Sequence, residues 1–319
     1  MSERAGAGAF AAFVAERQQS VEDALHALLP AADRTPARLH EAMRYAMFPG
    51  GKRLRPMLVL LGCRATGGDE RTDDVLRCSA SLECLHTYSL VHDDLPCMDD
   101  DDLRRGRATC HKVYGEALAL LAGDALLTLA FEGVAAGGGA AVAALARASG
   151  SVGMVGGQVE DLAAEGDSAG QTIERLQWIH DHKTGALITG GLLVGAHAGA
   201  AAPAAGAVPE GVLQLLARYG DLLGRAFQIA DDCLDLTGSA QELGKNPGAD
   251  VALDKLTWPK LVGLEQSLAT ARSLAEQAAG LAQEVVSAAA DWRGLDRSTL
   301  DGTVRLLQDV AFYAVERRS

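Results

Sequence analysis

Aromatic and basic residues are both scarce in this chain. Aromatic side chains make up 4% of its 319 residues, and 29 lysines and arginines stand against 42 aspartates and glutamates. The net charge of −13 excludes a generic nucleic-acid binder, which needs a basic face. So few aromatic rings also exclude the stacking platforms that bind single-stranded nucleic acids. The 9 prolines, beside 36 glycines and many alanines, favour helices that pack closely through small side chains.

Several common motifs are also missing. The six cysteines form no CxxC pair, which argues against a four-ligand zinc site, and a chain of this length does not need a disulfide scaffold. No HExxH, GxSxG or GxxxxGK[ST] pattern occurs, so a zinc peptidase, a serine hydrolase and a P-loop enzyme are not supported. The glycine-rich pieces follow no predicted strand, so a dinucleotide-binding fold is not supported either.

No targeting or membrane segment is predicted. The first twenty residues lack a basic region followed by an apolar block, and Glu16 interrupts them. Residues 185–208 carry no formal charge over a length that could cross a bilayer. This stretch is mostly glycine and alanine and contains Pro203, so it is interpreted as a buried helix that ends in a small-residue loop. We therefore expect a cytoplasmic protein with no membrane span.

Helical periodicity runs through nearly the whole chain, and no convincing run of alternating strand residues appears. The periodicity predicts helices that end near residue 47, begin near 54 and cover roughly 73–95, 111–135, 140–164, 171–182, 184–200 and 210–237. A further helix is opened by Thr257 and Pro259, and the last is capped by Asp296. The segment 195–211 could link two domains, but the chemistry described below needs both sides of it. The prediction is one all-α domain over residues 1–319.

The first of two aspartate clusters reads HDDLPCMDDDD, residues 92–102, and holds six aspartates. Asp93 and Asp99 are six residues apart, which places them on different faces of a regular helix. Pro96 supplies a break that lets Asp99 return beside Asp93.

The second cluster reads FQIADDCLD, residues 227–235, with Asp231, Asp232 and Asp235. Asp231 and Asp235 are four apart and share one helix face. Paired carboxylates behind apolar helices suit Mg²⁺, which keeps several waters and is usually completed by substrate phosphates. The alternative is a solvated acidic face, which is the usual explanation of a single charge run.

Basic residues also occur in small groups along the chain. Lys52 and Arg55 lie three apart at a predicted helix N-terminus, where the backbone N–H groups also favour an anion. The other groups are Arg104 and Arg105 after the first aspartate cluster, Lys183 with Thr184, and Lys245 and Lys255 around a glycine-containing loop. Each alone is more often a surface cation. Because charges are screened beyond about 8 Å in physiological salt, local cations can hold an anion on an acidic protein. The pattern suggests two phosphate-bearing substrates, one held through metal and one by basic side chains.

These residues resemble the trans-isoprenyl diphosphate synthases, most closely the bacterial farnesyl diphosphate synthases. The resemblance covers most of the chain in the expected order. It runs through GGKRLRP (50–56), LHTYSLVHDDLPCMDDDDLRRG (85–106), LAGDALL (121–127), GGQVEDL (156–162), HKTGALI (182–188), FQIADDCLD (227–235) and the final helix. The resemblance implies an isoprenoid-synthase-type helical bundle around a central catalytic cavity, usually as a homodimer.

The resemblance also implies roles for single residues. Three Mg²⁺ ions, or Mn²⁺, would clamp the diphosphate of an allylic substrate between the aspartates Asp93, Asp94, Asp99, Asp231, Asp232 and Asp235. That substrate would be bound by Arg104, Lys183, Thr184, Gln228, Lys245 and Lys255. The metal-free isopentenyl diphosphate would be bound by Lys52, Arg55, His86 and Arg105. The catalytic group would comprise Asp93, Asp94, Asp99, Lys183, Asp231 and Asp232. Where the family is usually apolar, this chain has Arg225.

The reaction implied is ionisation of an allylic diphosphate, attack by isopentenyl diphosphate and loss of a proton, with no protein nucleophile. Dimethylallyl and geranyl diphosphate would be the allylic substrates. Tyr88 lies five residues before Asp93, about one and a half helical turns away, where a bulky side chain would form a floor for the growing chain. In the family that this chain resembles, an aromatic residue there usually accompanies a fifteen-carbon product, so the resemblance implies farnesyl diphosphate. The alternative is that Tyr88 is simply a core aromatic.

Other activities remain open at this point. The nearest are synthases of geranylgeranyl or geranyl diphosphate. A terpene cyclase predicts one aspartate motif of this kind and no Lys52, Arg55 and His86 pocket, and a non-catalytic subunit predicts lost aspartates. A metal-dependent phosphohydrolase would normally need a histidine-rich set of ligands.

Overall fold

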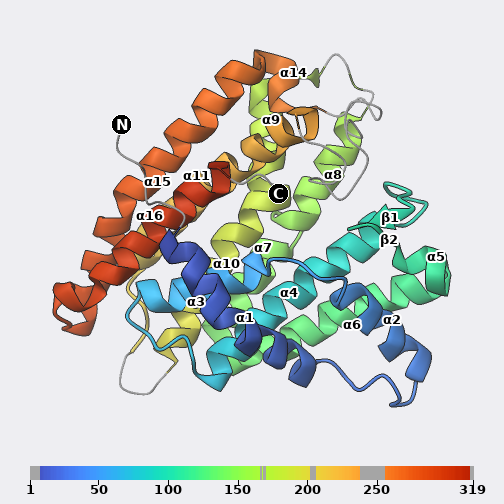
Figure 1. Cartoon of the computed structure of the whole chain (residues 1–319), viewed down its shortest axis with the longest axis horizontal. Helices are drawn as coiled ribbons and strands as arrows, with labels where there is room; N and C mark the ends of the chain where they lie inside the picture. Colours follow the sequence, from blue (N-terminus) through green and yellow to red (C-terminus); the bar gives the residue numbers. More distant parts are fainter. Residues whose placement is uncertain (1–7, 166, 168–169, 202–205, 238–255, 317–319) are drawn as a thin grey trace.

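Helices dominate the structure, and they lie against one another in a bundle (Figure 1). This computed structural model describes residues 8–165, 167, 170–201, 206–237 and 256–316. The predicted all-α class is confirmed. The chain comprises α1 (Gly8–Leu28), α2 (Ala37–Met47), α3 (Leu54–Ala65), α4 (Asp73–Asp93), β1 (Leu103–Arg104), β2 (Arg107–Ala108), α5 (Cys110–Tyr114), α6 (Glu116–Val134), η1 (Ala135–Gly137), α7 (Gly138–Ser149), α8 (Met154–Ala164), α9 (Ile173–Ile179), the π-helical segment η3 (His180–Gly185), α10 (Ala186–Ala200), α11 (Glu210–Thr237), α14 (Trp258–Val262), α15 (Leu264–Arg293), η4 (Arg297–Leu300) and α16 (Asp301–Glu316).

Two predicted helices are interrupted. The one predicted over 111–135 is split into α5 and α6 at Gly115, whose φ of +87° does not occur inside a right-handed helix. The one predicted over 140–164 is split into α7 and α8 by turn residues 150–153. The predicted cap Asp296 does accept a hydrogen bond, from the backbone N–H of Ser298, but it caps η4, and α16 follows.

The structure contains a short β-hairpin that the sequence did not predict. Strands β1 and β2 pair antiparallel, with Arg104 opposite Arg107, and each has two residues. Such strands are too short to show alternation in the sequence. Both turn residues, Arg105 and Gly106, have positive φ values, 52° and 74°, which suits a tight two-residue hairpin. The hairpin matters because it carries Arg104 and Arg105.

Helix α10 lies at the centre of the core and packs against α3, α4, α7 and α11. Small residues make this possible, as the composition predicted. A Cβ added at Gly62 would overlap the backbone of Leu192, and one added at Gly195 would overlap that of Val59. The backbones of α3 and α10 are therefore in direct contact. Helix α15 lies beside α11 and α16 along one edge of the bundle (Figure 1).

By length and composition, one stretch of the described chain could cross a membrane. It is Glu116–Ala164, and 44% of its most apolar window is buried. The core helices of soluble proteins pass the same test, and this stretch is interrupted at Ala135–Gly137 and again at 150–153. The finding is therefore weak support for a membrane span. Within the uncharged stretch noted in the sequence, Ala186–Ala200 form helix α10, most of which is buried.

Candidate active site

Helix α4 ends at Asp93, and the chain then turns back on itself. The backbone N–H of Asp99 donates to the carbonyl oxygen of Asp93 at 2.9 Å. Pro96 lies within this turn, so the predicted break is confirmed. The turn brings the carboxylates of Asp93, Asp94 and Asp99 to the end of one buried helix.

The pKa of Asp93 is raised to about 6. Burial is the largest cause, and the neighbouring carboxylates of Asp99 and Asp94 add to it. Lys183 and Arg104 act in the opposite direction and favour the charged form. The site therefore places a carboxylate where its negative charge is costly unless a cation lies close by.

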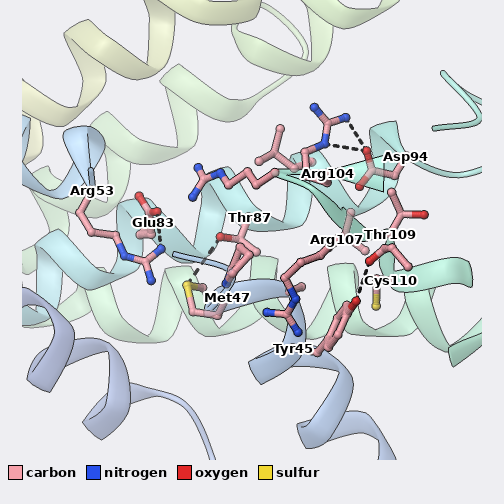
Figure 2. Close-up of a pocket in the computed structure, with 16 residues that line it drawn as sticks. Tyr45, Met47, Arg53, Glu83, Thr87, Asp94, Arg104, Arg107, Thr109 and Cys110 are labelled. Carbon is pink, nitrogen blue, oxygen red and sulfur yellow. Dashed lines mark hydrogen bonds and ion pairs between the residues drawn. The ribbon is translucent and has the colours of Figure 1, made fainter. Parts of the chain in front are cut away.

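Arg104 is the cation nearest to Asp94. From β1 its Nε donates to Asp94 Oδ1 at 2.9 Å, and its Nη2 donates to the same oxygen (Figure 2). The same Nη2 also donates to Asp101 Oδ2 at 3.0 Å. Burial raises the pKa of Asp94, and this guanidinium partly offsets the effect. Arg104 is thus already engaged by carboxylates of the first cluster.

Lys183 connects the first cluster with a second group of side chains. Its Nζ donates to Asp161 Oδ2 on α8 at 2.6 Å. Burial alone would lower the pKa of Lys183, but Asp161, Asp93 and Asp99 outweigh it, so the pKa is raised. Lys183 remains a cation between two sets of carboxylates.

A cavity opens around this lysine on the side of α11. Its walls combine one lysine, three carboxylates and one amide that lie far apart in the sequence. The lining residues are Asp161, Ile179, His180, Lys183, Thr184, Gln228, Asp231, Asp232, Leu256 and Thr257. Lys183, Thr184 and Gln228 therefore line one cavity with Asp231 and Asp232 of the second aspartate cluster, and Asp235 is not among its lining residues.

Asp232 is enclosed within this cavity wall. It is 5% exposed, its Oδ2 accepts from the backbone N–H of Trp258 at 2.8 Å, and its Oδ1 accepts from Gln228 Nε2 at 3.2 Å. His180 Nε2 lies 3.5 Å from Oδ2. Burial lowers the His180 pKa to about 3, so this ring is neutral at physiological pH. Asp231 is exposed and Asp235 is buried on the same helix.

The cations predicted to bind without metal lie around the start of α3. Between Lys52 and Arg55, Arg53 was given no role; it forms the N-cap in a left-handed conformation and is fixed by Glu83 of α4 through an ion pair of 3.0 Å (Figure 2). Arg55 Nη1 donates to His86 Nε2 at 3.0 Å. Burial, followed by nearby guanidiniums, lowers the pKa of His86 well below its usual value, so the ring accepts as a neutral group.

The two remaining cations of this group lie next to it. Arg105 Nη1 donates to the carbonyl oxygen of Gly50, which connects the hairpin to the loop before α3. Lys52 is exposed, and its Nζ lies 5.7 Å from the centroid of the Tyr313 ring on α16. The final helix therefore contacts the predicted isopentenyl diphosphate pocket.

The donor set fits a divalent cation with oxygen ligands. Nowhere in the described residues do three histidine, cysteine or acidic side chains come together to hold a metal ion. A complete cage is not required, because Mg²⁺ typically takes one or two carboxylates and completes its shell with waters and substrate phosphates. A cation beside Asp93 would also offset the repulsion that raises the pKa of that residue. The ligand set and the number of ions stay predictions.

Sequence reasoning missed some residues of the site, and two of the residues that it predicted lie outside the described part of the chain. Asp161 and His180 were given no role, although GGQVEDL had been singled out as a motif and its aspartate is the acceptor for Lys183. Lys245 and Lys255 lie outside the described residues. Tyr88 is 6% exposed on α4, and its pKa is raised by burial and by Asp93.

The helical bundle thus sets Lys183 beside the first aspartate cluster and in the wall of a cavity that it shares with Asp231 and Asp232 of the second. The chain belongs to the polyprenyl synthetase family, whose sequence profile matches residues 36–291. These comparisons confirm the predicted family and the predicted bundle.

Two curated plant relatives are similar over most of this chain. Geranylgeranyl pyrophosphate synthase 12, chloroplastic, of Arabidopsis thaliana is 44% identical over 85% of this chain and 75% of its own length. The chloroplastic geranylgeranyl pyrophosphate synthase of Capsicum annuum is 43% identical over 84% and 72%.

Solved structures extend the similarity to nearly the whole chain. The FPP/GFPP synthase of Zymomonas mobilis has a TM-score of 0.78 at 35% identity and covers 97% of this chain and 99% of its own. The geranyltransferase of Legionella pneumophila has a TM-score of 0.75 at 32% identity and covers 95% and 96%. The protein is therefore a prenyltransferase, and its product length is not defined by these similarities.

Proposed function

We propose that this prenyltransferase condenses isopentenyl diphosphate with dimethylallyl and geranyl diphosphate and that farnesyl diphosphate is its main product. The observation that carries the proposal is the position of Lys183. It interacts with Asp93 and Asp99 of the first aspartate cluster and lines a cavity with Asp231 and Asp232 of the second. One anionic group placed beside Lys183 would be within reach of both clusters.

The residues around Lys183 act on the allylic diphosphate. Lys183 and Arg104 offset negative charge as the diphosphate leaves, and Thr184 and Gln228 orient it by hydrogen bonds. A divalent metal, where bound by the aspartates, supplies further charge stabilisation for this leaving group. The residues supply no covalent nucleophile in this scheme, and pyrophosphate itself accepts the final proton.

Lys52, Arg55, His86 and Arg105 hold isopentenyl diphosphate in the second pocket. The Arg55–His86 contact fixes the guanidinium, and the neutral ring adds no further positive charge to a site crowded with cations. Positioning the double bond against the allylic carbon is the main contribution of this pocket.

Replacement of Lys52 by alanine is expected to raise the KM for isopentenyl diphosphate far more than the KM for the allylic substrate. The reason is that Lys52 lies next to Tyr313 of α16 and is not among the residues that line the cavity around Lys183. Steady-state kinetics with each substrate varied in turn measures the two constants. Arg71→Ala, at an exposed arginine paired with Asp69, is the control and should change neither. Equal increases in both constants would show that the two pockets are wrongly assigned.

The chain length of the product rests on Tyr88. Its ring is buried on α4 one and a half turns before Asp93, where a tail anchored at the aspartates would end. Tyr88→Ala is expected to shift the products from fifteen to twenty or more carbons, as read by chromatography of the dephosphorylated alcohols. Tyr88→Phe keeps the bulk and should keep the fifteen-carbon product. A folded Tyr88→Ala variant that still stops at fifteen carbons would remove the support for this floor.

A twenty-carbon product is the second candidate. The names of the plant relatives support it, since those proteins are geranylgeranyl pyrophosphate synthases at 42 to 44% identity. The same product analysis on the unaltered protein decides between the two candidates. Geranylgeranyl diphosphate as the main product of the wild type would support the second candidate and contradict the first. A homodimer, implied by the resemblance, and a cytoplasmic location, expected because the sequence predicts no targeting segment, are proposed as well.

A further inference from the structure

An ion pair joins α11 to the π-helical segment that carries Lys183. From α11, Arg225 donates through Nε to Asp181 Oδ1 at 2.6 Å and through Nη2 to Asp181 Oδ2 at 2.7 Å. The side chain of Gln177 on α9 lies against the same guanidinium. Oriented so that its oxygen faces the donors, its amide accepts from Nη1 at 2.6 Å and from Nη2 at 3.1 Å. One arginine thus connects α9, η3 and α11.

Segment η3 has an unusual backbone geometry, which must be stabilised by contacts with its neighbours. It is six residues of π-helix, His180–Gly185, between α9 and α10. Such turns are rare, occur mostly as single turns and are common at functional sites. If η3 relaxed to ordinary α-helix, the side chains of Lys183 and Thr184 would point in new directions, since each residue adds about 100° of rotation in an α-helix.

Glycines bring the neighbouring helices into direct contact with η3. A Cβ added at Gly224, next to Arg225, would lie 2.8 Å from Gly185 Cα. A Cβ added at Gly157 on α8 would overlap the backbone of Lys183. Segment η3 is therefore held between α8 and α11 by backbone packing, and the Arg225–Asp181 pair adds a directional contact at one end.

We propose that Arg225 is a positioning residue that acts through Asp181 to hold η3 so that Lys183 and Thr184 face the allylic diphosphate. This inference rests on the proposed function, because it assigns Lys183 to that substrate. Gln228 and Asp231, which line the cavity together with Lys183, follow Arg225 on the same helix by less than one turn and less than two turns. The pair therefore sets the distance between Lys183 and the second aspartate cluster.

The contribution of this pair to stability is expected to be small. The side chains of Arg225 and Asp181 are 34% and 25% exposed, and ion pairs near the surface stabilise proteins only weakly. If the pair only stabilised the fold, its removal would therefore change both the kinetic constants and the melting temperature very little. A positioning role would change kinetics for one substrate with little change in the melting temperature.

The test compares Arg225→Leu, Asp181→Asn and the double variant with Arg218→Leu, an exposed arginine two turns earlier on α11. Arg225→Leu and Asp181→Asn are each expected to lower kcat/KM for the allylic substrate by about 10- to 100-fold, the range expected for small misplacements. The KM for isopentenyl diphosphate should not change. The double variant should be no worse than either single one, since both remove the same contact. Arg218→Leu should resemble the wild type.

A second measurement separates this inference from the proposed function. Calorimetry with inorganic pyrophosphate and MgCl₂ reports on the allylic diphosphate subsite without turnover. Weaker pyrophosphate binding by Arg225→Leu supports the positioning role even if the wild type transfers no prenyl group, a result that would refute the proposed function alone. Wild-type pyrophosphate affinity and wild-type allylic kcat/KM in Arg225→Leu would overturn the positioning role, as would equal losses for both substrates.

Discussion

Replacing Asp93 with asparagine is expected to lower kcat by at least about 100- to 1,000-fold, the usual effect of losing one transition-state stabiliser. Asparagine keeps the size of the side chain but removes the negative charge that would attract a divalent cation. The variant should fold, because Asp93 is half-buried and the pKa of its carboxyl is already raised to about 6 by burial and by its neighbours. Single-turnover assays at saturating Mg²⁺ and both substrates measure the effect.

Asp102→Asn is the matched control for this experiment. Asp102 belongs to the same run of aspartates, but it is exposed, pairs with Lys112 at 2.6 Å and is not among the carboxylates that act on Lys183. It should retain nearly full activity. Excess chelator should abolish the activity of the wild type. Full turnover in chelator, or equal losses in the two variants, would contradict a metal role for the first aspartate cluster.

Replacing Lys183 with methionine is expected to reduce kcat/KM for the allylic substrate by about 100-fold or more, because the charge lost lies between both groups of carboxylates. The acid limb of the pH–rate profile should also move. Lys183 favours the charged form of Asp93, so its removal raises the Asp93 pKa further above about 6. Asp93 then becomes protonated at a higher pH, and the acid limb of the profile shifts to higher pH. Initial rates between pH 5 and 8 measure both effects.

Lys112→Met provides the control, since Lys112 is an exposed lysine paired with an exposed aspartate. It should leave the rate and the pH profile unchanged. An unshifted acid limb in Lys183→Met would show that the group titrating in that limb is not coupled to Lys183. An unchanged allylic kcat/KM would remove Lys183 from the binding site.

The aspartate clusters could be predicted from the sequence because each has an unusual local composition. HDDLPCMDDDD combines a proline with carboxylates on both sides, and this fixed both the end of a helix and the return of Asp99 to Asp93. The boundaries of α11 also follow from periodicity and agree with the predicted 210–237. These features depend on residues that lie close together in the chain, so they can be predicted from the sequence alone.

Local breaks were harder to predict for the same reason. Gly115 is one glycine among many, and only its φ of +87° distinguishes it from the glycines that lie inside helices. The π-helical turn at η3 has no signature in HDHKTG, and the sequence suggested a gap between two helices instead. The hairpin that carries Arg104 has only two residues in each strand.

The sequence by itself determined the helical class, the two aspartate clusters, the basic groups and the resemblance to prenyl diphosphate synthases, because local periodicity and motif composition carry that information. Only the tertiary structure decided which charges meet. It paired Lys183 with Asp161, Arg104 with Asp94, and Arg225 with Asp181, across separations of 10 to 44 residues. Each pairing depends on how closely helices can approach, and glycines such as Gly157 and Gly224 permit an approach that residue spacing does not reveal. Charges interact strongly only over short distances in salt, so the chemistry of the site is decided by packing.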